Sequence, residues 1–134
     1  MSVKIISVAK QLPKHLRETK EIIPFVKQWM QGQESRFQRK VLKLFEGAGV
    51  DRRYSIMDAE EVFFKSSFEE KNNIYIKEAT KLAEQSLLKS LTKARLQPTD
   101  IDYIITVSCT GIMIPSVDAY LINSLQMRQD IVRL

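Results

Sequence analysis

Cys109 is the only cysteine of the 134-residue chain, and it stands where an apolar run gives way to a segment punctuated by Gly111 and Pro115. A cysteine becomes a nucleophile when a cationic neighbour, a helix N-terminus or a general base stabilises its thiolate. The adjacent Ser108 and Thr110 supply none of these. The local sequence therefore favours a small buried thiol near a pocket wall, with a reactive thiol as the open alternative.

A second group of residues that could take part in binding or catalysis is basic. Four cations are spaced three and four residues apart and share one face of an expected helix, opposite an apolar stripe: Arg36, Arg39, Lys40 and Lys43. Such a cluster can bind a dense polyanion through charge-assisted hydrogen bonds. A merely solvated helix face has the same spacing, so the pattern alone leaves both interpretations open.

Composition limits the remaining classes. The chain is 44% hydrophobic and 28% charged, which is typical of a globular protein, and its formal net charge is +5. No apolar run approaches the roughly 20 residues of a membrane span, and the N-terminus does not resemble a secretory signal. These features predict a cytoplasmic protein without a membrane partner. The basic residues are not interleaved with aromatic ones, and zinc-finger spacing is absent, so we expect no nucleic-acid partner and no metal site.

The N-terminal half must position the basic face. Residues 3–13 are rich in β-branched side chains and predict a strand. A helix is expected from about Thr19; because Pro24 would be tolerated only in its first turn, a later start is the alternative. A second helix follows Ser35 and ends at Gly47 and Gly49. Residues 50–73 have an irregular pattern with short extended pieces.

The C-terminal half must position Cys109. The longest helix is expected over residues 73–95, where one apolar stripe recurs at helical spacing: Ile76, Ala79, Ala83, Leu87, Leu91 and Ala94. Residues 103–109 predict a strand covered on both sides, Ser116 is a plausible helix N-cap, and residues 130–134 begin another strand. This order predicts an α/β layered domain with a mainly parallel sheet. We expect residues 1–134 to form a single incomplete domain.

Three separated segments carry a resemblance to a known family: "GAGVDRRY", "EEKNNIYIKEATKLAEQSLLKSL" and "DIDYIITVSCTGIMIPSVDAYLINSLQM". In this order they resemble the type III polyketide synthases, the chalcone/stilbene synthase family, and the bacterial tetrahydroxynaphthalene synthase-like members in particular. The resemblance covers most of the chain from about Lys40 onward. It implies a thiolase-type fold, of which this chain would be the N-terminal portion of the layered α-β-α domain.

The resemblance also assigns roles around Cys109. The family's nucleophile is a cysteine in a Gly-Cys step beyond "IVRL", and a distant histidine and asparagine complete its triad, so this chain would hold no catalytic residue. His15 lies too early to be that histidine. Cys109, Thr110 and Gly111 match the wall of the acyl-chain cavity, and Ile114 matches the position that crosses the dimer interface. Turn chemistry for Gly111 and an ordinary apolar loop role for Ile114 are the alternatives.

For the basic helix, the resemblance places Lys40 and Lys43 on two of the family's three positions that bind coenzyme A phosphates. The third position is Gly47 here, and Arg36 or Arg39, one turn away, would compensate. Arg52 and Arg53 also match the family, and we expect them to have a salt-bridged structural role.

The function implied is the N-terminal part of an acyltransferase that condenses a CoA-linked starter with malonyl-CoA to make polyketides. Acyl-CoA and malonyl-CoA would be substrates, no resident cofactor is expected, and a homodimer is expected. The 134 residues alone should be inactive because the triad is missing. Two alternatives remain: a non-catalytic module for dimerisation or acyl-CoA binding, and an initiating ketoacyl-ACP synthase of the same superfamily.

Overall fold

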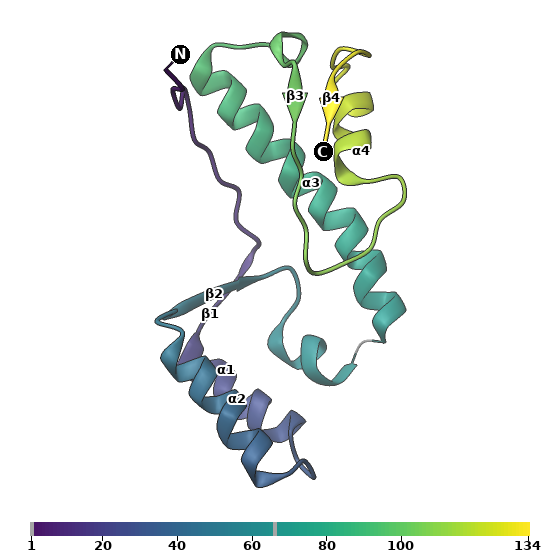
Figure 1. The fold of residues 1–134 in the computed structure, drawn as a ribbon. Helices are drawn as coiled ribbons and strands as arrows, with labels where there is room; N and C mark the ends of the chain where they lie inside the picture. Colours follow the sequence, from purple (N-terminus) through teal and green to yellow (C-terminus); the bar gives the residue numbers. More distant parts are fainter. Residues whose placement is uncertain (1, 66) are drawn as a thin grey trace. The chain divides into compact units, whose positions relative to one another are not determined.

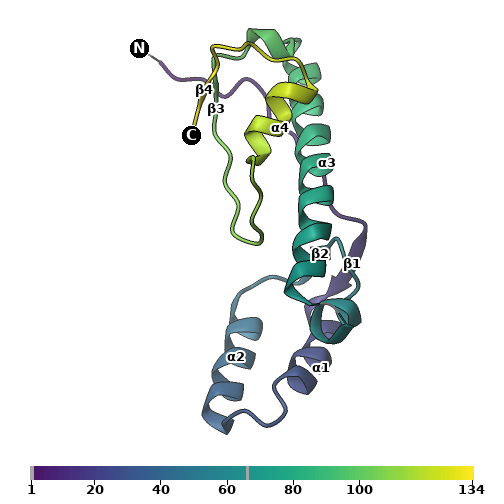
Figure 2. The ribbon, with the colours of Figure 1, turned by 90° about the vertical axis from the view of Figure 1, so that its right-hand side faces the viewer.

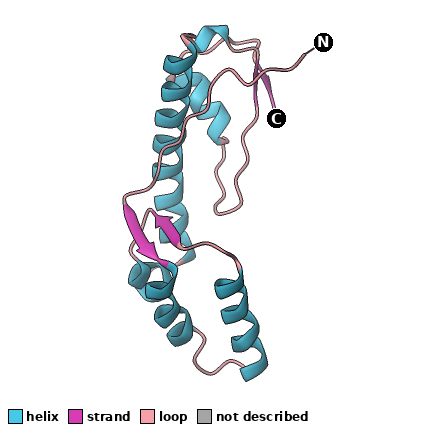
Figure 3. Ribbon diagram, turned by 90° about the vertical axis from the view of Figure 1, so that its left-hand side faces the viewer, coloured by secondary structure: helices cyan, strands magenta, loops and turns pink. Residues whose placement is uncertain are grey.

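The computed structural model describes residues 2–65 and 67–134 and is mostly helical, with two short strand pairs (Figure 3). The chain divides into two compact units. One unit comprises residues 13–71, and the other combines the N-terminal residues 2–12 with residues 72–134. Each unit is described separately below.

The unit of residues 13–71 places two helices and a π-helix around a strand pair (Figure 1). Strands β1 (His15–Glu18) and β2 (Arg52–Ser55) pair antiparallel. Helix α1 (Thr19–Trp29) follows β1 directly, α2 (Ser35–Gly47) packs against α1, and the π-helix η1 (Glu61–Lys65) also contacts α1. The short strand pair therefore joins the segment before α1 to the segment that follows α2.

Helix α1 begins at Thr19, as predicted. The preceding Glu18 and Glu21 form a capping box, in which each side chain accepts a hydrogen bond from the other residue's backbone N–H. The inference that Pro24 would delay the start of the helix is wrong, because Pro24 lies in the second turn. Pro24 and Lys20 are both exposed, so water can solvate the Lys20 carbonyl that loses its intrahelical donor.

The second unit is organised along helix α3 (Phe68–Ala94), which begins five residues before the predicted start. A 3₁₀ turn, η2 (Pro98–Asp100), leads to strand β3 (Tyr103–Ile104); a loop, helix α4 (Val117–Ser124) and strand β4 (Val132–Arg133) follow. Strands β3 and β4 pair parallel, and α4 lies beside α3 (Figure 2). Two further backbone bonds continue the pairing: Leu134 N donates to Ile104 O and Thr106 N to Leu134 O, each over 3.1 Å.

Two strand predictions need correction. Residues 3–13 form no strand; instead they run as an extended segment along α3, held by Ser7 to Ser90 and by Lys93 Nζ to the Val8 carbonyl. A strand needs a neighbour for its amides, and no described strand pairs with this segment. The predicted buried strand at 103–109 is regular only at Tyr103–Ile104, and the Val107 side chain beyond it is 92% exposed. The predicted mainly parallel sheet is thus a two-stranded pair in this chain.

The core of the second unit lies where α3 and α4 meet the β4 segment. Leu91, one member of the predicted α3 stripe, is buried, as are Leu121, Met127 and Ile131. Thr80 is also buried, which the sequence did not predict for a polar residue; its hydroxyl donates to the Ile76 carbonyl over 2.9 Å, and this hydrogen bond offsets the cost of burial. Among the helices described, none is long and apolar enough to cross a membrane.

Candidate functional site

The segment that contains Cys109 lies against α3 and encloses a cavity of about 400 Å³. Helix α3 supplies one wall, and residues 106–117 supply the other. The lining residues are Tyr75, Ala79, Ala83, Thr106, Val107, Ser108, Gly111, Met113, Ser116 and Val117. Most of these side chains are small, which leaves room between the helix and the loop.

The wall of the cavity that α3 supplies is shaped by residues at helical spacing. Tyr75, Ala79 and Ala83 are four residues apart and therefore lie above one another on one helix face. The two alanines leave space, and Tyr75 closes the end of the row. Its phenol donates to Ser108 Oγ over 2.5 Å, directly before Cys109. The sequence predicted that the two alanines lie on a buried face, whereas both are half-buried beside the cavity. It missed Tyr75, although the four-residue offset of Tyr75 from Ala79 was the available signal.

Asn72 forms a second attachment of the loop to α3. Its side-chain Nδ2 donates to the Ile112 carbonyl over 3.0 Å, and the Ile112 N–H donates to Asn72 Oδ1 over 2.8 Å. The amide group of one side chain thus replaces a strand partner for the backbone of Ile112. Nothing in the sequence pattern indicated this contact, because it joins residues 40 positions apart.

Gly111 lies where the loop comes closest to α3. A Cβ atom at this position would collide with the Tyr75 ring. The backbone of Gly111 is not in the left-handed region, so close approach, and not a turn conformation, explains why a side chain does not fit.

The structure distributes the predicted substrate-binding residues along this loop. Gly111 lines the cavity, whereas Cys109, Thr110 and Ile114 are exposed and are not among its lining residues. Ile114 is 93% exposed and precedes a cis peptide bond to Pro115. The expectation that Cys109 is buried is wrong: the regular strand ends at Ile104, and the thiol lies in an exposed loop.

The other end of the loop is fixed by a buried carboxylate. Asp118, in the first turn of α4, is 5% exposed; it accepts a hydrogen bond from Thr106 Oγ1 over 3.1 Å and faces Arg133 Nη1 at 3.6 Å. Hydrogen bonding from Ser116 chiefly lowers the pKa of Asp118, opposed by desolvation, and Thr106 and Arg133 lower it further. Asp118 thus joins α4 to the segment that follows β3 and to β4.

The predicted polyanion-binding residues form an exposed basic face on α2. The structure places all four on one helix: Arg36, Arg39, Lys40 and Lys43. Within the described part of the chain, none of them forms an ion pair with a carboxylate. The face is therefore free to meet an anion from solution.

The salt-bridged role predicted for Arg53 needs correction. Its Nε donates to Thr19 Oγ1 over 3.2 Å, and its guanidinium lies 5.0 Å from the centroid of the Phe45 ring. Arg53 therefore contacts a hydroxyl and an aromatic ring, and in the described residues it makes no ion pair. Arg52, its neighbour, is exposed.

The described residues also contain no cluster of His, Cys, Asp and Glu that could hold a metal ion.

The known proteins that are similar in sequence to this chain include two tetrahydroxynaphthalene synthases and a phloroglucinol synthase. The chain is 30% identical over 119 residues to a 1,3,6,8-tetrahydroxynaphthalene synthase of Streptomyces griseus, which covers 89% of this chain and 32% of that protein. It is 40% identical over 84 residues to the synthase of the same name from Streptomyces coelicolor. This match covers 63% of this chain and 22% of that protein. A phloroglucinol synthase of Pseudomonas fluorescens is 29% identical over 92 residues, which cover 69% and 26%. No family model matches the chain.

Solved structures agree. The crystal structure of the tetrahydroxynaphthalene synthase of Streptomyces coelicolor, a bacterial type III polyketide synthase, superposes with a TM-score of 0.79 at 28% identity, covering 96% of this chain and 37% of that one. The protein CsyB complexed with CoA-SH has a TM-score of 0.76 at 20% identity, covering 99% and 36%, which shows a shared fold. The chain spans about a third of the length of the first of these curated relatives.

Proposed function

Because this chain is a homologue of the type III polyketide synthases over about a third of their length, we propose that it contributes the N-terminal part of an acyltransferase of this kind. The enzyme would transfer a starter acyl group from CoA to a cysteine and extend it with malonyl-CoA. Decarboxylation of the malonyl unit would supply the enolate that attacks the bound thioester. The observation that carries the proposal is the structural match over 96% of the chain, with a TM-score of 0.79.

The part of this chemistry assigned to the present residues is containment of the acyl chain. The cavity between α3 and residues 106–117 has small side chains on both walls and a volume of about 400 Å³. Asn72 and Tyr75 hold the loop against α3, which fixes the width of the cavity. We assign Gly111 to the wall that faces a growing chain, Cys109 and Thr110 to the exposed loop beside that wall, and Ile114 to a contact with a second copy of the protein.

The second assigned role is recognition of coenzyme A by the basic face of α2. Lys40 and Lys43 would contact its phosphates, with Arg36 and Arg39 one turn away. Exposed, unpaired ammonium and guanidinium groups suit a flexible polyanion. A solved protein of the same fold is complexed with CoA-SH, which is consistent with this assignment.

Titration calorimetry with CoA tests the assignment. The double variant Lys40→Ala, Lys43→Ala should weaken binding by roughly two- to thirtyfold, since each exposed ionic contact contributes about 0.2–1 kcal/mol. The matched control is Lys77→Ala, Lys81→Ala on α3, which removes the same charge elsewhere. Equal losses in the two double variants would refute a specific site on α2.

Turnover gives a separate test. The chain contains one cysteine and one histidine. The resemblance places the triad outside these two residues, so we expect the purified chain neither to decarboxylate nor to condense malonyl-CoA. Reproducible product formation by the 134-residue chain would overturn this part of the proposal.

A second candidate function is a non-catalytic module for dimerisation or acyl-CoA binding. The observation that favours it is the exposed apolar tip of the loop, where Ile112 is 63% and Ile114 93% exposed. Light scattering on the purified chain tests the dimerisation module: a dimer that Ile114→Asp converts to a monomer supports it. A strict monomer at high concentration contradicts it.

A further inference from the structure

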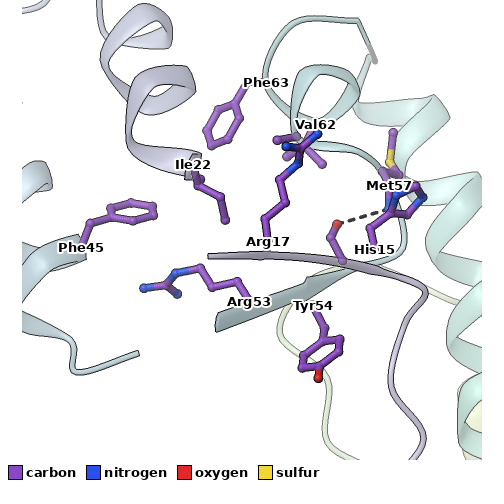
Figure 4. A pocket seen from close by; sticks show the side chains of 11 residues that line it. His15, Arg17, Ile22, Phe45, Arg53, Tyr54, Met57, Val62 and Phe63 are labelled. Atoms are coloured by element: carbon purple, nitrogen blue, oxygen red, sulfur yellow. Dashed lines mark hydrogen bonds between the residues drawn. The ribbon is translucent and has the colours of Figure 1, made fainter. Parts of the chain in front are cut away.

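The unit of residues 13–71 contains a pocket of about 230 Å³ that the proposed function does not use. Its side chains come from both strands, both helices and the η1 region, as Figure 4 shows. The apolar part of its lining is formed by Ile22, Phe45, Met57, Ala59, Val62 and Phe63. The polar part comes from the strand pair: His15 and Arg17 on β1, and Arg53 and Ser55 on β2.

The register of the strand pair places two cations opposite each other in this pocket. Arg17 pairs with Arg53, and His15 pairs with Ser55. Alternate residues of a strand point to the same side, so these four side chains share one face of the pair. Like charges directly opposite each other on an antiparallel pair are destabilising, so an anion beside either arginine stabilises the pair.

One of the two arginines is neutralised within the protein. Arg17 Nη2 lies 2.7 Å from Asp58 Oδ2, and this pairing raises the pKa of Arg17 and lowers that of Asp58. Arg53 donates through Nε to the Thr19 hydroxyl and covers the Phe45 ring, and it has no carboxylate partner among the residues that the structure describes. Of the two arginines that line the pocket, Arg53 is thus the one whose charge no described carboxylate neutralises.

We propose that this pocket binds a small organic monocarboxylate, with its carboxylate on Arg53 and an aromatic or short aliphatic body among Ile22, Val62 and Phe63. The planar guanidinium matches the two oxygens of a carboxylate. One unneutralised cation suits a single negative charge, and the largely apolar walls suit a hydrocarbon body more than a phosphate. The volume lies below the 300–1,000 Å³ that is usual for drug-sized ligands, so a small acid fits.

The site is distinct from the proposed CoA surface. None of the four basic residues assigned to CoA lines the pocket. The two assignments can therefore fail independently: loss of CoA binding in the Lys40→Ala, Lys43→Ala variant says nothing about Arg53.

Methyl NMR on the 134-residue chain, with benzoate as the probe, tests the proposal. Benzoate should shift the methyl signals of Ile22, Met57 and Val62 in a saturable manner, while benzamide, which has the same body without the charge, should bind at least about tenfold more weakly. Inorganic phosphate should leave these methyl signals in place.

Three variants test whether Arg53 supplies the positive charge that binds benzoate. Arg53→Gln keeps a donor for Thr19 and should lower benzoate affinity by about tenfold or more, whereas Arg53→Lys should retain part of it. Arg52→Gln removes the same charge from the exposed neighbouring position and should leave affinity unchanged. The proposal is overturned if benzoate leaves the three methyl signals unmoved, if benzamide binds equally well, or if Arg52→Gln and Arg53→Gln weaken binding equally. If Arg53→Gln does not fold, the comparison of benzoate with benzamide on the unmodified chain decides the question.

Discussion

The Tyr75 hydroxyl and Ser108 Oγ lie 2.5 Å apart, so a residue of α3 holds the loop directly before Cys109. The same ring blocks a side chain at Gly111, three residues further along the loop. Tyr75 therefore fixes the loop by one hydrogen bond and by one steric contact. These two interactions can be tested separately.

Gly111→Ala should destabilise the loop by about 1–3 kcal/mol, because its new methyl group collides with the Tyr75 ring. The control is Gly47→Ala in α2, where the added methyl meets no atom within 4 Å and alanine favours the helix. Urea unfolding followed by circular dichroism compares the two variants. Equal stability of both would contradict the predicted collision.

Asn72→Ala should remove both hydrogen bonds to Ile112 and release the loop from α3. We expect the Ile112 amide to lose its protection, with hydrogen exchange faster by roughly tenfold for each 1.4 kcal/mol of lost local stability. Asn73→Ala, at the exposed neighbouring position, is the matched control and should leave that amide unchanged. An Ile112 amide that exchanges at the same rate in both variants would refute the clamp.

Cys109 should react rapidly with a thiol reagent in the folded protein, because its side chain is exposed. The rate of labelling by 5,5′-dithiobis(2-nitrobenzoate) should lie close to that of the urea-unfolded chain. Labelling that becomes measurable only after unfolding would show that the thiol is buried.

Because of Asp118, the free energy of unfolding should decrease as the pH falls into the acid range. Its pKa is lowered below the ordinary value of 3.8 in the folded protein, so the carboxylate contributes stability above that value. This contribution is lost as the pH falls through the lowered pKa, since the folded state then binds the proton that the unfolded state has already taken up. Asp118→Asn should be less stable near pH 7 and should have a shallower decline of unfolding free energy below about pH 4. Identical pH profiles for the two proteins would contradict this role.

The sequence predicted the helices well and the sheet poorly, for a physical reason. The apolar stripe of α3 repeats within a few turns of one helix, so local spacing contains the information. A strand depends on a partner elsewhere: residues 3–13 have β-branched side chains but no strand beside them, and they lie along α3 instead. β-propensity alone does not produce pairing.

The candidate site, too, was predictable where it depends on local sequence and unpredictable where it depends on contacts between distant residues. The segment around Cys109 and the basic face of α2 were recognisable from residue types and from the resemblance to a family. The attachments through Asn72 and Tyr75 were not, because they join α3 to a loop more than 30 positions away. The buried thiol was mispredicted because burial was inferred from a strand that ends at Ile104.

The strand pairing described above also leaves strand edges that can pair with another molecule. Each described sheet has only two strands, so every strand has one side without a neighbour, and its amides and carbonyls there can serve as a template for another extended chain. Two-stranded pairs are marginal on their own, and a third strand would stabilise them. The β3–β4 pair, with Val132 and Leu134 exposed, is the place where strand addition between molecules would begin, and a lysine on that outer edge would be the simplest way to keep the protein soluble.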